Sequence, residues 1–173
     1  MTKRTVILIL LWAVVVLWMG VIFSFSMETA EQSAESSDSV LETVLRMIDK
    51  KFDTYSSARQ TQLLEQYSKL IRKTAHFCIY AALGFFISNA LTYQKLTCQK
   101  LTFHRRTPWK TACFSFLIGA AYAVSDEIHQ FFVPGRSCQI SDMLLDSAGV
   151  ATGVAFSAIL VMLIRKHKKS RAN

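Results

Sequence analysis

Long apolar runs alternate with polar segments along this chain. The runs are Thr5 to Phe25, Thr74 to Thr92, a stretch that begins around Pro108 and Trp109, and Ile140 to Ile164. A helix needs about 20 apolar residues to cross a bilayer core of roughly 30 Å. Hydrophobic residues make up 51% of the sequence, which is typical of a membrane protein. The pattern predicts an all-α membrane protein with about four transmembrane helices.

The first run has two interpretations. Lys3 and Arg4 precede it, as basic residues precede the apolar region of a secretory signal peptide. That region usually has only about 7–15 residues, and this run is longer. We therefore expect residues 1–26 to form a retained N-terminal transmembrane helix.

Residues 27–71 form a more polar segment between the first two runs. The part from 27 to 39 is rich in Ser and Glu and predicts little helix. Beyond it, apolar residues recur at three- and four-residue spacing in two stretches, as in amphipathic helices. We expect these helices to lie on the outer leaflet or on the bundle. A lid over the charged stretch described below is the alternative.

Basic residues are unevenly distributed along the chain. The start, the loop after the second run and the C-terminal tail carry twelve of the 20 Lys and Arg and none of the 12 Asp and Glu. Lys and Arg concentrate in cytoplasmic loops. Both termini are therefore predicted to be cytoplasmic, with residues 27–71 and 125–146 at the extracytoplasmic face. The net charge of +8 is then a topology signal and gives little support to nucleic-acid binding.

Charged side chains interrupt the apolar pattern between the third and fourth runs. They are Asp126, Glu127, His129, Arg136, Asp142 and Asp146. Ionisable groups near the bilayer face a protein interior or a wet cavity and usually mark function. The break around Pro134 and Gly135 predicts a re-entrant-like loop, which is tolerated at membrane depth only when buried in protein or facing water.

A second polar set lies at the start of the second run. Arg72, His76 and Tyr80 are four residues apart, so they share one face of a helix. The predicted topology brings this face to the same depth as the charged stretch. We therefore expect the two sets to form one site.

Two segments of the chain resemble the VanZ-like family. They are RKTAHFCIYAALG, residues 72–84, and SDEIHQFFVPGRSCQISDMLLDSAGVATG, residues 125–153. The family pattern maps onto Arg72, His76, Asp126, Glu127, Gln130, Pro134, Gly135, Arg136, Asp142 and Gly149. The chain departs from it at Ile79, where an acid is common, and at Asp146, where asparagine is common.

The resemblance implies a small bacterial multi-pass membrane protein whose core is residues 72–173. The family's namesake is associated with resistance to teicoplanin, a glycopeptide antibiotic. This chain is therefore expected in the cell membrane, with membrane lipids as partners. A phosphate-bearing headgroup or a cell-wall precursor is the expected ligand.

Two functions stay open. One is binding or modulation of an outer-leaflet lipid or cell-wall component; the other is acid–base catalysis on a phosphate-bearing, lipid-linked headgroup. A transporter is a weaker third, because there is no visible inverted repeat. The histidines and acids do not have a diagnostic metal-ligand spacing, so we expect no metal and no other cofactor. Candidate catalytic residues are His76, Asp126, Glu127, His129 and Asp142, and candidate substrate-binding residues are Arg72, Lys73, Tyr80, Gln130, Arg136 and Asp146.

Overall fold

The protein is all-helical, as predicted. The computed structural model describes residues 2–98 and 108–171. The elements are α1 (Lys3–Ser26), α2 (Ala30–Ile48), the short 3-10 helix η1 (Phe52–Thr54), α3 (Ser57–Cys98), α4 (Pro108–Gln130) and α5 (Ile140–Ser170).

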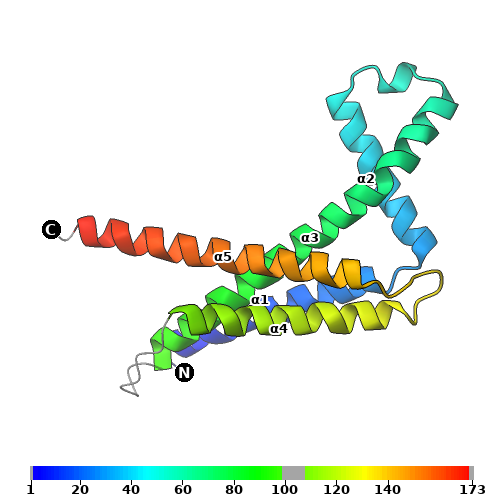
Figure 1. Ribbon diagram of the computed structural model, residues 1–173. Helices are drawn as coiled ribbons and strands as arrows, with labels where there is room; N and C mark the ends of the chain where they lie inside the picture. Colours follow the sequence, from blue (N-terminus) through cyan, green and yellow to red (C-terminus); the bar gives the residue numbers. More distant parts are fainter. Residues whose placement is uncertain (1, 99–107, 172–173) are drawn as a thin grey trace.

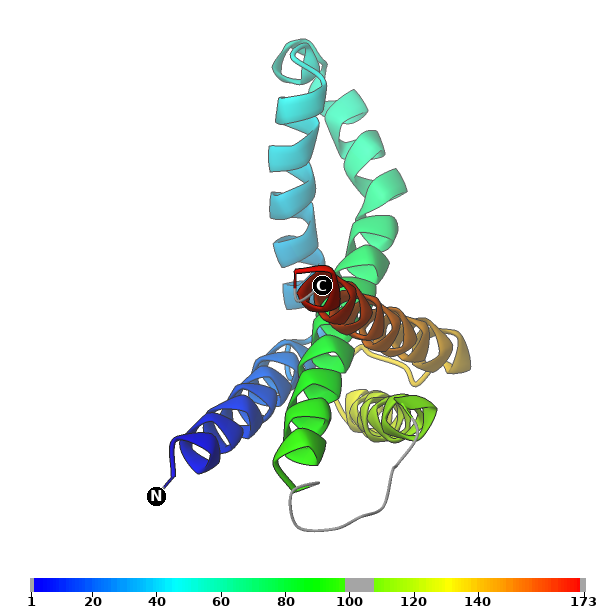
Figure 2. The ribbon, with the colours of Figure 1, turned by 90° about the vertical axis from the view of Figure 1, so that its left-hand side faces the viewer.

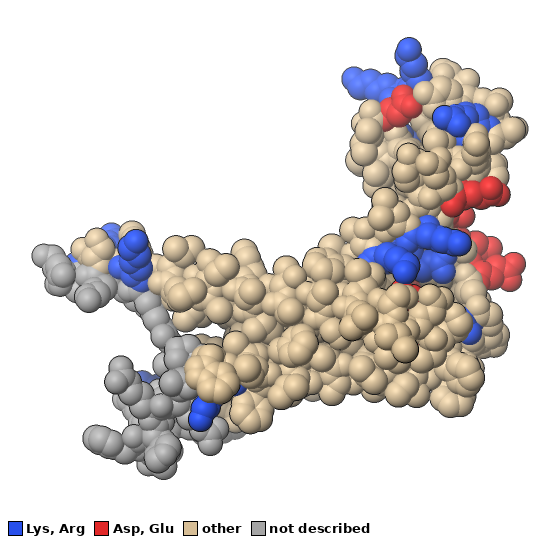
Figure 3. All heavy atoms as spheres, viewed as in Figure 1, with Lys and Arg blue, Asp and Glu red and all other residues tan. Residues whose placement is uncertain are grey.

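Three of these helices are long and apolar enough to cross a membrane, within the described residues. They are Lys3–Ser26, Ser57–Lys95 and Ile140–Ile164. The 23 residues of α4 would reach about 34 Å at 1.5 Å per residue, but its composition leaves it outside this set. Large apolar side chains on the bundle surface are exposed, as Leu17, Leu117 and Met162 illustrate. Figure 3 shows the resulting uncharged belt, with Lys, Arg, Asp and Glu gathered toward its two ends.

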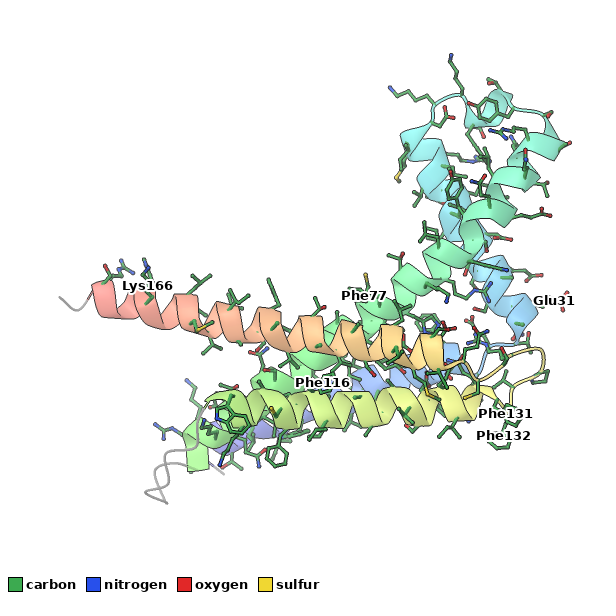
Figure 4. All side chains as sticks on the ribbon, in the orientation of Figure 1. Glu31, Phe77, Phe116, Phe131, Phe132 and Lys166 are labelled. Carbon is green, nitrogen blue, oxygen red and sulfur yellow. The ribbon has the colours of Figure 1, made fainter. Side chains whose placement is uncertain are left out.

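The helices form a bundle that α3 crosses obliquely. α1, α4 and α5 run alongside one another, and α3 passes between them and beyond (Figure 1). Seen along the bundle, the second half of α3 lies between α1 on one side and α4 and α5 on the other (Figure 2). Both chain ends lie opposite the α4–α5 connection, so that Lys166 and Phe132 mark the two ends (Figure 4). We call the end that contains Phe132 the loop end.

The core lies where α3 meets its neighbours. Tyr80, Leu83 and Ile87 on α3 are fully buried, as are Ala123 on α4 and Val150 on α5. This buried strip on one helix is the centre of the apolar cluster that also includes residues of α1.

Two side-chain hydrogen bonds fasten α1 to the bundle. The Trp18 indole donates to the backbone carbonyl of Ile79 on α3 at 2.8 Å. The Tyr122 hydroxyl on α4 donates to the carbonyl of Met19 on α1 at 2.7 Å. Each bond satisfies a polar group that would otherwise face apolar surroundings. They hold α1 in contact with both α3 and α4.

Glycines bring α3 and α5 into close contact. A Cβ on Gly149 would lie 2.5 Å from the carbonyl oxygen of Phe77, and one on Gly153 would overlap the carbonyl of Ala81. From the other side, a Cβ on Gly84 would overlap the carbonyl of Val150. Small residues that let helix backbones approach are the usual packing device of membrane helices. Gly149 and Gly153 therefore serve the packing of α5 against α3.

The prediction of little helix over residues 27–39 is wrong, because α2 begins at Ala30. The Thr29 hydroxyl accepts from the Gln32 backbone N–H, and the Gln32 side chain accepts from that of Thr29. This capping box satisfies two N–H groups at the start of the helix. Ser33 and Ser37 are buried, so packing stabilises a segment whose composition is a poor helix former.

The second amphipathic stretch and the second apolar run form one continuous helix. α3 has 42 residues, and its first half pairs with α2 in a hairpin that projects sideways from the loop end (Figure 1). The division between the predicted segments 27–71 and 72–173 falls inside α3. The basic loop predicted between residues 95 and 110 lies largely at 99–107, outside the described residues.

Candidate functional site

A polar cavity of about 200 Å³ lies at the loop end of the bundle. α3, α4, α5 and the loop between α4 and α5 all contribute to its walls, together with the first residue of α2. It is lined by Ala30, Arg72, His76, Glu127, Gln130, Gly135, Arg136, Ser137, Gln139, Asp142, Leu145 and Asp146. The cavity thus brings residues of the charged stretch 125–146 together with residues from the start of the second apolar run, as the sequence predicted.

Two arginines carry the positive charge of the cavity. Arg72 lies on α3, and Arg136 lies in the loop, where its Nη2 donates to the carbonyl of Phe25 at 3.2 Å. The Nε atoms of both arginines are buried and have no hydrogen-bond partner among the described residues. Burial lowers the pKa of Arg136 below its ordinary value, and the positive charge of Arg72 lowers it further. Neither guanidinium forms an ion pair with an acid among the described residues.

The α3–α5 contact brings a histidine to a buried carboxylate. His76 Nδ1 lies 3.7 Å from Asp146 Oδ1. This distance is too long for a good hydrogen bond. Asp146 is 1% exposed, and neither of its carboxylate oxygens has a hydrogen-bond partner in the described part of the protein. A buried carboxylate without donors is costly, and in native proteins it usually has a partner.

Beside the cavity lies a buried hydrogen-bonded group centred on Asp126, which is 3% exposed. The Tyr80 hydroxyl donates to Asp126 Oδ2 at 2.9 Å, and Gln130 Nε2 donates to the same oxygen at 3.2 Å. Tyr80 and Asp126 do not line the cavity, whereas Gln130 does. The group therefore joins α3 to α4 behind the cavity wall.

Two further acids line the cavity and have partners. Glu127 is buried, and its Oε1 accepts from the backbone N–H of Gln139 at 2.9 Å, which anchors the loop to α4. Asp142 Oδ1 accepts from Lys73 Nζ at 2.8 Å, in a half-exposed ion pair between α5 and α3. Lys73 itself is not among the lining residues.

One predicted site residue lies apart from the others. His129 does not line the cavity; its ring packs against Phe23 of α1, with the centroids 4.8 Å apart. Spacing on α4 allowed His129 to share a face with Asp126, but the bonds of Asp126 go to Tyr80 and Gln130 instead. Ten of the predicted site residues thus lie in, or next to, one polar region, and His129 faces the first helix.

Several contributors to this region were not predicted. Ala30 is the first residue of α2, and its backbone N–H donates to the Pro134 carbonyl at 3.3 Å. Gln139 and Phe25 act through backbone groups, which have no sequence signature. Only the closeness of Gln139 to the predicted Arg136 could have indicated it. The others depend on how α1 and α2 meet the loop.

Metal ligation has no evident place in the described residues. No group of three His, Cys, Asp or Glu side chains there is arranged to hold a metal ion. The cavity is lined by two guanidinium groups, three carboxylates and one histidine. Such a set can bind charged groups or transfer a proton.

Comparison with known proteins identifies the family. Residues 11–163 match the model of the VanZ/LLP1 family. Searches of curated proteins and of solved structures gave no match. The matched residues include α2, η1, α3 and α4 in full, most of α1 and α5, and every residue that lines the cavity. The chain belongs to the VanZ/LLP1 family.

Proposed function

We propose that this multi-pass membrane protein of the VanZ/LLP1 family binds the phosphate-bearing headgroup of a lipid or lipid-linked cell-wall precursor at the outer face of the membrane. The observation that carries the proposal is the pair of arginines at one cavity, each with a buried, unpartnered Nε within the described chain. A guanidinium presents a fork of N–H donors that matches phosphate oxygens. Charge-assisted bonds to a phosphate would satisfy both side chains.

The size of the cavity favours a headgroup over a whole lipid. Its volume of about 200 Å³ is below the roughly 300–1,000 Å³ of pockets that enclose drug-sized ligands. The acyl chains of a bound lipid would stay in the bilayer, beside the exposed apolar surface of the bundle. This arrangement needs no large enclosed pocket.

The proposal includes a topology. α4 crosses the membrane as a fourth helix, both termini are cytoplasmic, and the loop end faces outward with a re-entrant-like loop. The distribution of Lys and Arg along the chain supports this orientation. Phe131 and Phe132 are 64% and 75% exposed at the loop end, which suits contact with the outer leaflet. A membrane-impermeant maleimide should label exposed Cys138 in intact cells when the other cysteines are replaced by serine; labelling only after lysis would reverse the orientation.

Binding can be tested with short-chain lipids and purified protein in a phosphate-free detergent. Titration calorimetry should show binding of dihexanoyl phosphatidylglycerol and none of dihexanoylglycerol. Arg136→Gln should weaken binding about tenfold or more, because a charge-assisted hydrogen bond contributes about 1.5–3 kcal/mol and about 1.4 kcal/mol is a factor of ten. Equal binding of the phosphate-free lipid would refute the proposal.

Catalysis on the same headgroup is a second candidate, favoured by the approach of His76 to Asp146 at the cavity wall. Histidine titrates near neutral pH and can act as a general acid or base. In this case His76→Gln should keep normal abundance and lipid affinity while turnover of labelled lipid-linked substrates is lost. Absence of turnover by the wild type across headgroup classes would leave binding alone.

A role in glycopeptide resistance would follow if the bound headgroup belongs to a cell-wall precursor. The teicoplanin concentration that inhibits growth should then rise on expression of the wild type and stay unchanged with Arg136→Gln. Both proteins must be present at equal levels in the membrane.

A further inference from the structure

The cavity has an anionic half that a phosphate cannot satisfy. Asp146 lines it, is almost completely buried and has no hydrogen-bond partner for either oxygen among the described residues. His76 Nδ1 lies 3.7 Å from Asp146 Oδ1, too far for a good hydrogen bond. A carboxylate accepts at about four lone-pair sites, so this group is left with its acceptors open.

The other acids do not share this state. Asp142 is paired with Lys73 at 2.8 Å, so this lysine is not available to Asp146. Glu127 Oε1 accepts from the Gln139 backbone N–H, and the other oxygen of Glu127 has no hydrogen-bond partner among the described residues. The open acceptors of the cavity therefore belong to Asp146 and Glu127.

Charges of both signs thus line one small space. Arg72 and Arg136 offer unpartnered donors, and Asp146 offers two unpartnered acceptor oxygens. Glu127 adds a second carboxylate, of which Oε1 is bound to Gln139. A bare phosphate would pair with the arginines but would bring a second anion close to Asp146. A ligand with both an anionic and a cationic group complements both halves.

We propose that the headgroup carries a primary ammonium group beside its phosphate, and that Asp146 and Glu127 bind this ammonium while Arg72 and Arg136 bind the phosphate. The inference rests on the proposed phosphate binding and names the class of headgroup. An ammonium group has three N–H donors for the open carboxylate oxygens, whereas a hydroxyl has one and a quaternary ammonium has none. An ethanolamine phosphate headgroup has this chemistry.

The test compares three soluble lipids that share a phosphate and differ in the second group. Dihexanoyl phosphatidylethanolamine, phosphatidylcholine and phosphatidylglycerol are titrated into the full-length protein in dodecyl maltoside. We expect the ethanolamine lipid to bind about tenfold more tightly than the other two, the difference that about one charge-assisted contact gives. Asp146→Asn should lower its affinity to that of the glycerol lipid, whose own affinity should not fall, because the variant removes an anion close to the phosphate.

Two further variants keep the test informative. Glu65→Gln removes an acid on the exposed part of α3 and should leave all three affinities unchanged. Glu127→Gln should reduce the preference in the same direction as Asp146→Asn, and it serves if the latter fails to fold. Melting temperature and gel filtration report folding of each variant.

The outcomes separate the two proposals. Equal binding of the ethanolamine and glycerol lipids by the wild type overturns the ammonium site and leaves phosphate binding standing. Equal binding of the ethanolamine and choline lipids overturns the requirement for N–H donors. If none of the three lipids binds, phosphate binding fails first, and the ammonium site fails with it.

Discussion

The two halves of α3 pack in opposite ways. The second half meets α5 backbone to backbone, through Gly84, Gly149 and Gly153. The first half pairs with α2, where Leu41 is buried but much of the surface is exposed. One helix is thus held tightly at one end and loosely at the other. The site lies where the tight part begins.

This difference explains how the site is positioned. The close contact between α3 and α5 fixes the positions of His76 and Tyr80 on α3 and of Asp146 on α5. Their geometry therefore depends on the absence of side chains at the glycines between the two helices. The cavity is lined by Ala30 at the start of α2 and by Arg72 and His76 of α3, and none of the hairpin residues 31–71 lines it in the described structure. The hairpin therefore does not cover the cavity in this structure, and the alternative of a lid finds no support in it.

The largest loss of stability should come from adding a side chain where α3 and α5 are in backbone contact. A Cβ at Gly153 would overlap the Ala81 carbonyl. Gly153→Ala must push the helices apart, and overpacking costs about 1–3 kcal/mol or occasionally more. Because the obstacle is backbone, we expect about 3 kcal/mol or more, seen as a fall in melting temperature and in the yield of monodisperse protein.

Gly20→Ala is the matched control, because a Cβ at Gly20 meets nothing within 4 Å. It should be neutral or stabilise slightly, since alanine is favoured over glycine in a helix by about 1 kcal/mol. Equal melting temperatures for the two variants would show that the crossing is not as tight as its geometry implies.

Much of the helical framework could be predicted from the sequence, because long apolar runs have few alternatives in a membrane. Thr5 to Phe25 corresponds to α1 within two residues, and the fourth run begins with α5 at Ile140. The start of α2 could not be predicted from composition, because buried serines and a capping box outweigh its low intrinsic preference. Its capping box was present as Thr29 and Gln32, a signal in the sequence that was missed.

The candidate site could be predicted as a set but not as an arrangement. Helical spacing brought Arg72, His76 and Tyr80 to one face, and the charge distribution matched their depth to the acids. It could not decide which way His129 turns, because the rotation of α4 is set by its packing against the other helices, mainly α5 and α3. Backbone donors such as the N–H of Gln139 have no residue type that would indicate them.

The next largest loss of stability should come from removing a single buried hydrogen-bond donor near the α3–α5 contact. Tyr80→Phe leaves Asp126 with only the Gln130 donor at 3.2 Å. Leaving a buried charged acceptor short of a partner costs about 1–3 kcal/mol. We expect a loss near the top of that range, measured as chemical or thermal stability in detergent.

Tyr122→Phe removes a hydroxyl that donates to an uncharged backbone carbonyl, that of Met19. The net contribution of such a bond is only about 0.5–1.5 kcal/mol. A loss in Tyr122→Phe as large as in Tyr80→Phe would mean that Asp126 contributes no special stability to the region.

The smallest effect should come from the far end of the hairpin. Met47 and Ile48 are 76% and 78% exposed at the end of α2, and substitutions of exposed side chains usually change stability by less than about 0.5 kcal/mol. The double variant Met47→Ser, Ile48→Ser should therefore keep the melting temperature in detergent. Its affinity for dihexanoyl phosphatidylglycerol should also stay within about twofold of the wild type, because a change of only about 0.4 kcal/mol corresponds to that factor. A large change in affinity would instead show that the hairpin reaches the cavity in solution, and the lid would return as an explanation.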